Sequence, residues 1–158
     1  MNIYTLKVGL TGPHAPDGDD VWRLIEVKGN QTLHSLHRAI FRAFDRWEEH
    51  LYSFFMSENR RDPSQEYTSP IDIEGAAVGG VMPGNAAVTR LNVLALTPGT
   101  KFYYLFDFGE SWEHTVEVIS VQDKEPEGRY PVVVERHGES PLQYRYEDDE
   151  EGRSPYVG

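Results

Sequence analysis

The chain has 158 residues, of which 15 are basic and 26 acidic, and its formal net charge is -11 at neutral pH. This length suits one domain, and the negative balance disfavours nucleic-acid phosphates and anionic membrane surfaces as partners. Cysteine is absent, which excludes disulfides, thiol nucleophiles and thiolate metal sites. No apolar run approaches the roughly 18 residues of a membrane span. The first residues lack a signal-peptide pattern, so we expect a cytoplasmic protein.

The N-terminal third predicts two strands followed by a helix. Residues 3–10 and 21–27 alternate between apolar and polar side chains, which is typical of half-buried strands. Thr32 is a favourable N-cap. After it, apolar positions recur at spacings of three and four, which predicts a helix whose buried stripe is Leu33, Leu36, His37, Ile40, Phe44 and Trp47. Residues 37–46 also hold the only basic cluster, and we interpret its arginines, including Arg46, as a solvated helix face.

The remaining elements are short strands and connections. Residues 51–56 predict a third strand, and residues 57–88 a long flexible connection in which a lid is one alternative. The glycine-rich stretch 75–85 lacks the Gly-Lys-Ser/Thr ending of a phosphate-binding loop. Residues 90–96 predict a short helical turn. Strands follow at 101–108, 112–122 and 130–136, and the acidic tail 147–158 is expected to be solvated and mobile.

This order of elements predicts an α+β fold. Strand hairpins with one long helix between them favour a helix packed on a mainly antiparallel sheet. The first part follows the order of a β-grasp fold. We expect a single domain over residues 1–146, followed by the acidic tail.

The segment FDFGESWEH, residues 106–114, predicts a hairpin in a specific register. A three-residue turn beginning at Gly109 would pair Phe108 with Trp112 and Phe106 with His114, and so place the aromatic sets on one face. A one-residue slip would move every side chain to the opposite face, so the pattern excludes it. Glycine also suits the left-handed position of such a turn. The DFG triplet does not indicate a kinase, because the other kinase segments are missing.

The predicted register constrains the polar residues of this hairpin. Asp107 and His114 would point to opposite faces and could not chelate one ion. Asp107 would lie opposite Glu113, a like-charge pair that needs a nearby cation or donor. Asp107 can also accept hydrogen bonds from the turn backbone, and His114 is expected to be a packed, hydrogen-bonded histidine.

Histidines provide the one alternative with catalytic character. His37 lies on the apolar stripe, His50 precedes the third strand and His114 follows the glycine turn. If these three side chains converged, they would form a three-histidine metal site. With Asp107 or Glu113 they could then support metal-assisted hydrolysis. The sequence itself requires no cofactor.

Taken together, these segments resemble the plasmid pRiA4b open-reading-frame-three-like family, also labelled the insertion-element passenger TnpR family. The resemblance covers roughly residues 3–140. It implies a small α+β domain, carried in some members by mobile elements. Two departures are Tyr52, where relatives often have histidine, and the lack of cysteine in residues 138–152. The positions that match the family pattern are Trp22, Leu36, His37, Trp47, His50, Leu51, Phe54, Asp107, Phe108, Gly109, Trp112 and His114.

The sequence therefore favours a non-catalytic binding or adaptor module with an unidentified protein or small ligand as partner. Two alternatives remain open. One is a metal-assisted hydrolase built on the histidine cluster. The other is a nucleic-acid-associated protein of an insertion element, although direct DNA binding is not expected from an acidic chain.

Overall fold

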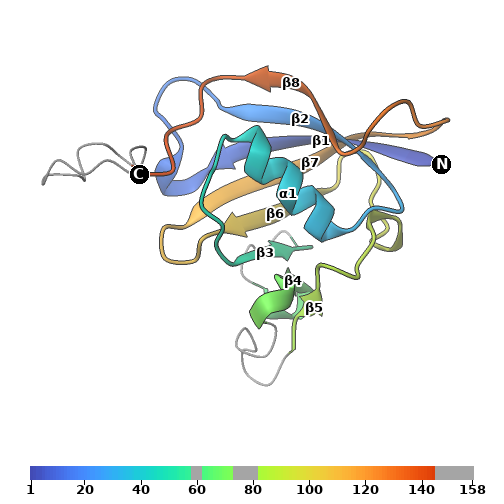
Figure 1. The fold of residues 1–158 in the computed structure, drawn as a ribbon, viewed down its shortest axis with the longest axis horizontal. Helices are drawn as coiled ribbons and strands as arrows, with labels where there is room; N and C mark the ends of the chain where they lie inside the picture. The colour runs from blue at the N-terminus through green and yellow to red at the C-terminus, as the bar shows by residue number, and fades with distance from the viewer. Residues whose placement is uncertain (58–61, 73–81, 145–158) are drawn as a thin grey trace, which may run out of the picture.

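The computed structural model describes residues 1–57, 62–72 and 82–144. One sheet of eight strands has the order β5-β4-β3-β6-β7-β1-β2-β8, and the helix α1 lies across one of its faces (Figure 1). The elements are β1 (Asn2–Thr11), β2 (Trp22–Lys28), α1 (Leu33–Ala43), β3 (Tyr52–Phe55), β4 (Glu66–Thr68), β5 (Gly84–Asn85), β6 (Lys101–Phe106), β7 (Trp112–Asp123) and β8 (Val132–His137), with short 3-10 turns that include η3 (Pro70–Asp72) and η4 (Leu91–Val93).

The sheet is antiparallel except for the short β4–β5 pair, which is parallel. The α+β prediction, with one helix on a mainly antiparallel sheet, is confirmed. The β-grasp-like detail is not confirmed, since β6 and β7 lie between β3 and β1. Residues 57–88 were expected to be one irregular connection, but their described part contains β4 and β5. Most of the stretch 75–85 and the tail 147–158 lie outside the described residues.

The core lies between α1 and the sheet. Alternation in β1 and β2 places Leu6, Val8 and Ile25 under the helix, where each is fully buried. Leu36 and Ile40 of α1 meet them from above and are also fully buried. Each such side chain contributes on the order of 2 kcal/mol by leaving water, so the predicted apolar stripe accounts for the docking of α1.

The C-terminus of α1 differs from the prediction in a way that shapes the site. The helix ends at Ala43, and Asp45 adopts left-handed backbone with φ 56°. The Asp45 amide donates to the Arg42 carbonyl and the Arg46 amide donates to the Phe41 carbonyl, both at 3.1 Å. This pair of bonds is a Schellman motif. It reverses the chain, so Arg46 points into the core with only 6% exposure, whereas a continuing helix would have left it solvated.

The early end of α1 also explains the surroundings of two further residues, Trp47 and Arg23. Trp47 was expected on the buried stripe, but it comes after the reversal and is 38% exposed. Arg23, which alternation places on the same face as Ile25, is buried and donates to the Ala43 carbonyl at 2.8 Å. The Arg136 guanidinium donates to the same carbonyl at 2.6 Å. The arginines thus satisfy a terminal helix carbonyl that would otherwise lack a partner, at the end where cations are favourable.

The β6–β7 hairpin keeps the predicted faces but not the predicted register. Phe106 pairs with Trp112, and Tyr104 pairs with His114. The connection has five residues rather than three, and the left-handed positions are Asp107 and Ser111, at φ 61° and 56°. A slip of two residues leaves every side chain on the same face, so the apolar pattern could not separate a three-residue turn from a five-residue one.

The register change corrects three further expectations. Phe108 lies in the turn and is 40% exposed, so it is not a core residue. Glu113 lies opposite Leu105 and not opposite Asp107, which removes the expected like-charge pair. Gly109 has no left-handed backbone to accommodate.

Candidate functional site

His114 lies at the bottom of a buried polar network. Its Nδ1 is 3.2 Å from the Tyr104 carbonyl oxygen, and its Nε2 is 2.9 Å from Arg46 Nη2. The carbonyl can only accept and the guanidinium can only donate. His114 therefore carries its proton on Nδ1 and accepts at Nε2. Burial, followed by the charge of Arg46, lowers the pKa of His114 well below its ordinary value, so the ring is neutral.

Arg46 itself is held by aromatic rings instead of a carboxylate. Its guanidinium lies 5.2 Å from the ring centres of Phe44 and Phe106 and 4.8 Å from that of Trp112. Such cation–π contacts stabilise a desolvated cation. Burial nevertheless lowers the pKa of Arg46 to about 10. Among the described residues, Arg46 Nη1 is buried without a hydrogen-bond partner.

A second buried histidine, His37, links the network to the surface. Its Nε2 is 2.7 Å from Glu49 Oε1, and its Nδ1 is 2.6 Å from the Tyr104 hydroxyl. Burial outweighs the hydrogen bond to Glu49 and lowers the pKa of His37. Burial also raises the pKa of Tyr104 well above its ordinary value, so the hydroxyl keeps its proton.

The protonation of these groups follows from their partners. Burial disfavours the charged form of Glu49, but the hydrogen bond from His37, together with a backbone hydrogen bond from His50, outweighs burial and holds the pKa of Glu49 below its ordinary value. An ionised carboxylate only accepts, so His37 Nε2–H donates to Glu49 and Tyr104 O–H donates to His37 Nδ1. His37 and His114 are thus neutral in opposite tautomers, each set by its neighbours.

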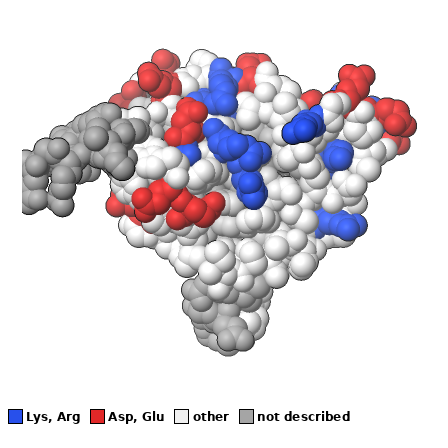
Figure 2. All heavy atoms as spheres, viewed as in Figure 1, with Lys and Arg blue, Asp and Glu red and all other residues white. Residues whose placement is uncertain are grey.

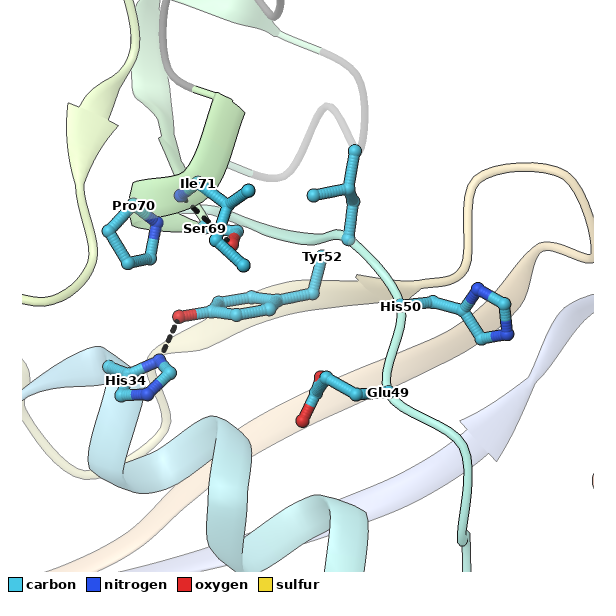
Figure 3. Close-up of a pocket in the computed structure, with 8 residues that line it drawn as sticks. His34, Glu49, His50, Tyr52, Ser69, Pro70 and Ile71 are labelled. Atoms are coloured by element: carbon cyan, nitrogen blue, oxygen red, sulfur yellow. Dashed lines mark hydrogen bonds between the residues drawn. The ribbon is translucent and has the colours of Figure 1, made fainter.

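Glu49 marks the edge of an open pocket of about 340 Å³ (Figure 3). The pocket lies between the start of α1, the chain entering β3, and the segment from β4 to η3. Its apolar lining is Leu51, Pro70 and Ile71, and its polar lining is His34, Glu49, His50, Tyr52 and Ser69. A mostly apolar hollow with a few polar groups is the usual form of a small-ligand site.

Tyr52 and His34 form the inner end of this pocket. The Tyr52 ring is stacked at 3.8 Å on the ring of His37, and its hydroxyl is 2.7 Å from His34 Nδ1. Burial, followed by the charge of Arg38, lowers the pKa of His34. Burial raises the pKa of Tyr52. The inner end is therefore neutral at physiological pH, and the negative charge of the pocket comes from Glu49 at the rim.

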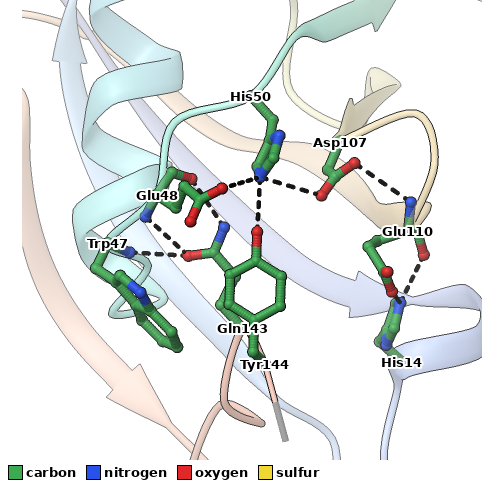
Figure 4. Close-up of polar contacts among 8 residues, drawn as sticks. All are labelled: His14, Trp47, Glu48, His50, Asp107, Glu110, Gln143 and Tyr144. Carbon is green, nitrogen blue, oxygen red and sulfur yellow. Dashed lines mark hydrogen bonds and ion pairs between the residues drawn. The ribbon is translucent and has the colours of Figure 1, made fainter. Parts of the chain in front are cut away.

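His50 borders the pocket but directs its ring toward a separate cluster (Figure 4). Its Nε2 lies 2.8 Å from the Tyr144 hydroxyl, 3.3 Å from Glu48 Oε1 and 3.5 Å from Asp107 Oδ2. Burial and then the hydrogen bond to Glu48 raise the pKa of Tyr144 to about 12. The cluster ties the β6–β7 turn to the segment after β8.

Asp107 has a local role in that turn. Its carboxylate accepts from the Glu110 amide at 3.3 Å, and its carbonyl accepts from the Ser111 amide at 2.7 Å. His14 stacks on Trp112 at 3.9 Å and binds the Glu110 carbonyl at 2.6 Å from the other side. These contacts shape the turn and present no open coordination site.

The three histidines proposed as metal ligands do not share a site. His37 binds Tyr104 and Glu49, His50 faces Tyr144 and its acidic neighbours, and His114 binds Arg46 and a carbonyl. Within residues 1–57, 62–72 and 82–144, no group of three or more His, Cys, Asp or Glu side chains is arranged to hold a metal ion. In the same residues no helix is long and apolar enough to cross a membrane.

The remaining family-pattern residues are structural in position. Phe54 is fully buried among aromatic side chains, and Trp112 is buried beneath His14. Trp22 is half-buried on the sheet face, stacked at 5.1 Å on His137. Trp47 meets the Tyr144 ring edge-on at 5.6 Å.

A model of the plasmid pRiA4b ORF-3-like protein family matches residues 2–144. The chain belongs to this family. Among solved structures, it is similar to a protein of unknown function, MM3350, from Methanosarcina mazei Go1, with 21% sequence identity and a TM-score of 0.68. The match covers 90% of this chain and 72% of the other, and at this identity it shows the fold alone. No curated protein matches the chain.

Sequence reasoning did not identify several residues that define the site. Glu49 and Tyr104 were not considered as hydrogen-bond partners of His37, nor Tyr52 as its stacking partner, because all three lie outside the helix that carries His37. Arg46 was assigned to a solvated face. A usable signal existed for Arg23, since strand alternation already placed it among buried apolar residues.

Proposed function

We propose that this member of the pRiA4b ORF-3-like family is a non-catalytic binding module whose pocket takes a small ligand or a single side chain of a partner. The observation that carries this proposal is the pocket of about 340 Å³ beside Glu49 and Tyr52. Its lining combines three apolar residues with a few polar groups, which supports binding of a small group with a defined orientation.

The hydrogen bonds that protein groups make to the ring nitrogens of His37 and His114 favour binding over catalysis. A general base or nucleophile needs a nitrogen or oxygen that can reach a substrate. In His37 and His114 both ring nitrogens are engaged by protein groups, and both side chains are buried. The His37 ring instead supports the wall of the pocket, since it stacks on Tyr52 and binds Glu49. His37, His50 and His114 do not converge on one site among the described residues, so a metal-assisted hydrolase likewise has no support.

A nucleic-acid role has weak support on the surface. Figure 2 shows Lys and Arg side chains across the middle of one face, over α1, with acidic side chains to either side. In α1, Arg38 and Arg42 are exposed, whereas Arg46, which follows the helix, is buried. A short basic strip within a chain of charge -11 does not resemble a phosphate-binding surface. The cytoplasmic location and a link to mobile elements stay predictions.

The proposal is tested by a fragment screen followed by heteronuclear NMR. We expect some fragments to shift the amide signals of His34, Tyr52 and Ser69 in a saturable manner. The variant Ser69→Phe should fill the pocket and abolish these shifts, while unchanged signals from the β1–β2 hairpin show that the fold persists. A screen in which no fragment produces localised shifts would remove the binding-module proposal.

A further inference from the structure

The charge of the pocket restricts the chemistry of its ligand. Glu49 contributes an ionised carboxylate at the rim, and 55% of its side chain remains exposed. The histidine at the inner end, His34, is neutral. His50 turns its Nε2 toward Tyr144 and its acidic neighbours, outside the pocket. An anionic ligand would meet an unbalanced negative charge here, while a cation would find a partner.

The carboxylate is also held in place before any ligand arrives. Glu49 Oε1 accepts from His37, and His37 is fixed in turn by the Tyr104 hydroxyl and by stacking on Tyr52. Three of these four side chains are nearly or fully buried, so the hydrogen bond anchors an otherwise exposed carboxylate. An anchored partner loses less conformational entropy on binding.

The same hydrogen bond discriminates between kinds of cation. A guanidinium pairs with both carboxylate oxygens through a planar fork, whereas an ammonium acts as a point charge and needs one. Oε1 of Glu49 is already used by His37, which opposes a bidentate pair. A hard metal ion would need several more oxygen ligands than the pocket presents. Leu51, Pro70 and Ile71 add an apolar wall suited to an aliphatic stem.

Building on the proposed function, we propose that the pocket binds a protonated primary amine carried on a short aliphatic stem, with the ammonium on Glu49 and the stem along Leu51, Pro70 and Ile71. A free alkylamine and the side chain of a lysine share this chemistry. The two sources differ in what surrounds the stem.

NMR titrations with three probes test this inference: n-pentylamine, the neutral 1-pentanol, and N-acetyl-lysine methylamide. We expect both amines to shift the amide signals of Glu49, Tyr52 and Ser69, and 1-pentanol to bind several-fold more weakly. The Glu49→Gln variant should weaken amine binding about fivefold, the upper range for a partly exposed ion pair. Its amide oxygen can still accept from His37, so the fold is expected to persist.

Glu48→Gln is the matched control. The substitution removes the same charge as Glu49→Gln, and Glu48 is adjacent to Glu49 and similarly exposed at 56%. Glu48 faces His50, however, and does not line the pocket. Unchanged amine affinity in this variant supports a local site. Equal losses in both variants would show attraction to the overall negative charge and would overturn the inference.

The remaining outcomes are also decisive. Tighter binding of the lysine probe than of pentylamine identifies a protein side chain as the source, and the reverse identifies a free amine; both support the shared chemistry. Equal affinity of 1-pentanol and pentylamine overturns the amine inference but leaves a binding pocket, so the proposed function survives. If none of the three probes shifts pocket residues, the amine inference fails, and the fragment screen decides the proposed function separately.

Discussion

The Tyr104 hydroxyl offers the sharpest test of the buried network. The change Tyr104→Phe removes the O–H that lies 2.6 Å from His37 Nδ1 and leaves the rest of the ring in place. The nitrogen then stays buried without a donor, because His37 is fully buried. A buried acceptor that loses its partner costs about 1 to 3 kcal/mol. We therefore expect the free energy of unfolding to fall by about 2 kcal/mol.

Tyr52→Phe is the matched comparison, since it deletes a hydroxyl that lies 2.7 Å from His34 Nδ1. His34 is only half-buried and lines the open pocket, so water can replace the lost hydroxyl. This variant should cost less than about 1 kcal/mol. Urea unfolding measures both values. Calorimetry should show Tyr104→Phe lowering Tm by about 4 to 8 °C, from roughly 2 to 4 °C per kcal/mol at this chain length.

Two results would refute this reasoning. Equal costs for the two tyrosines would mean that burial does not decide the penalty. A cost below about 0.5 kcal/mol for Tyr104→Phe would mean that His37 does not depend on the hydroxyl. Nitrogen chemical shifts add an independent check, because they should report a proton on Nε2 in His37 and on Nδ1 in His114.

Further predictions concern the turn, the helix end and pH. Gly109→Ala should change the free energy of unfolding by less than about 0.5 kcal/mol, because an added Cβ meets only Asp107 Oδ1 at 3.7 Å. Gly138→Ala should destabilise the fold, since φ of Gly138 is 77° and the added Cβ would lie 2.6 Å from a backbone oxygen. Urea unfolding of both variants distinguishes them, and a large loss for Gly109→Ala contradicts the observed turn. Asp45→Gly should stabilise by up to about 1 kcal/mol by relieving left-handed backbone, measured as a higher urea midpoint. The pKa values of His37 and His114 lie below 6.5 in the folded state, so the unfolded state binds more protons below that pH. The contribution of these histidines to the free energy of unfolding is therefore complete above about pH 6.5 and is lost as the pH falls. Urea unfolding at about pH 7.5, 6.5 and 5.5 measures this, and a free energy of unfolding that does not decline would contradict it.

Local patterns predicted much of the fold correctly. Alternation found the β1–β2 hairpin, and Thr32 with the three–four spacing found the start and buried face of α1, because these signals depend on neighbours within one or two turns. The faces of Phe106, Trp112 and His114 were also correct. Their register was not, since a shift of two residues leaves the alternation unchanged.

The candidate site was only partly accessible to the same reasoning. His37 and His114 were singled out, and the structure places both within one polar network. Their partners come from segments far apart in the chain, such as Glu49 after the helix and Tyr104 in β6. No spacing rule connects such residues, so the pocket was not visible in the sequence.

By itself, the sequence determined the fold class, the resemblance to the pRiA4b family, the exclusion of thiol chemistry and most of the buried faces of β1, α1 and the β6–β7 hairpin. These follow from composition and from periodicity within a segment. Only the tertiary structure decided that Arg46 turns inward, that His37, His50 and His114 do not converge on one metal site, and that Glu49 lies at the rim of a pocket. Left-handed backbone at Asp45 reverses the chain after α1, and that reversal brings Arg46 to His114, a contact between residues 68 positions apart. A hydrogen bond of this kind depends on where two segments meet in space, which the local pattern of neither segment encodes.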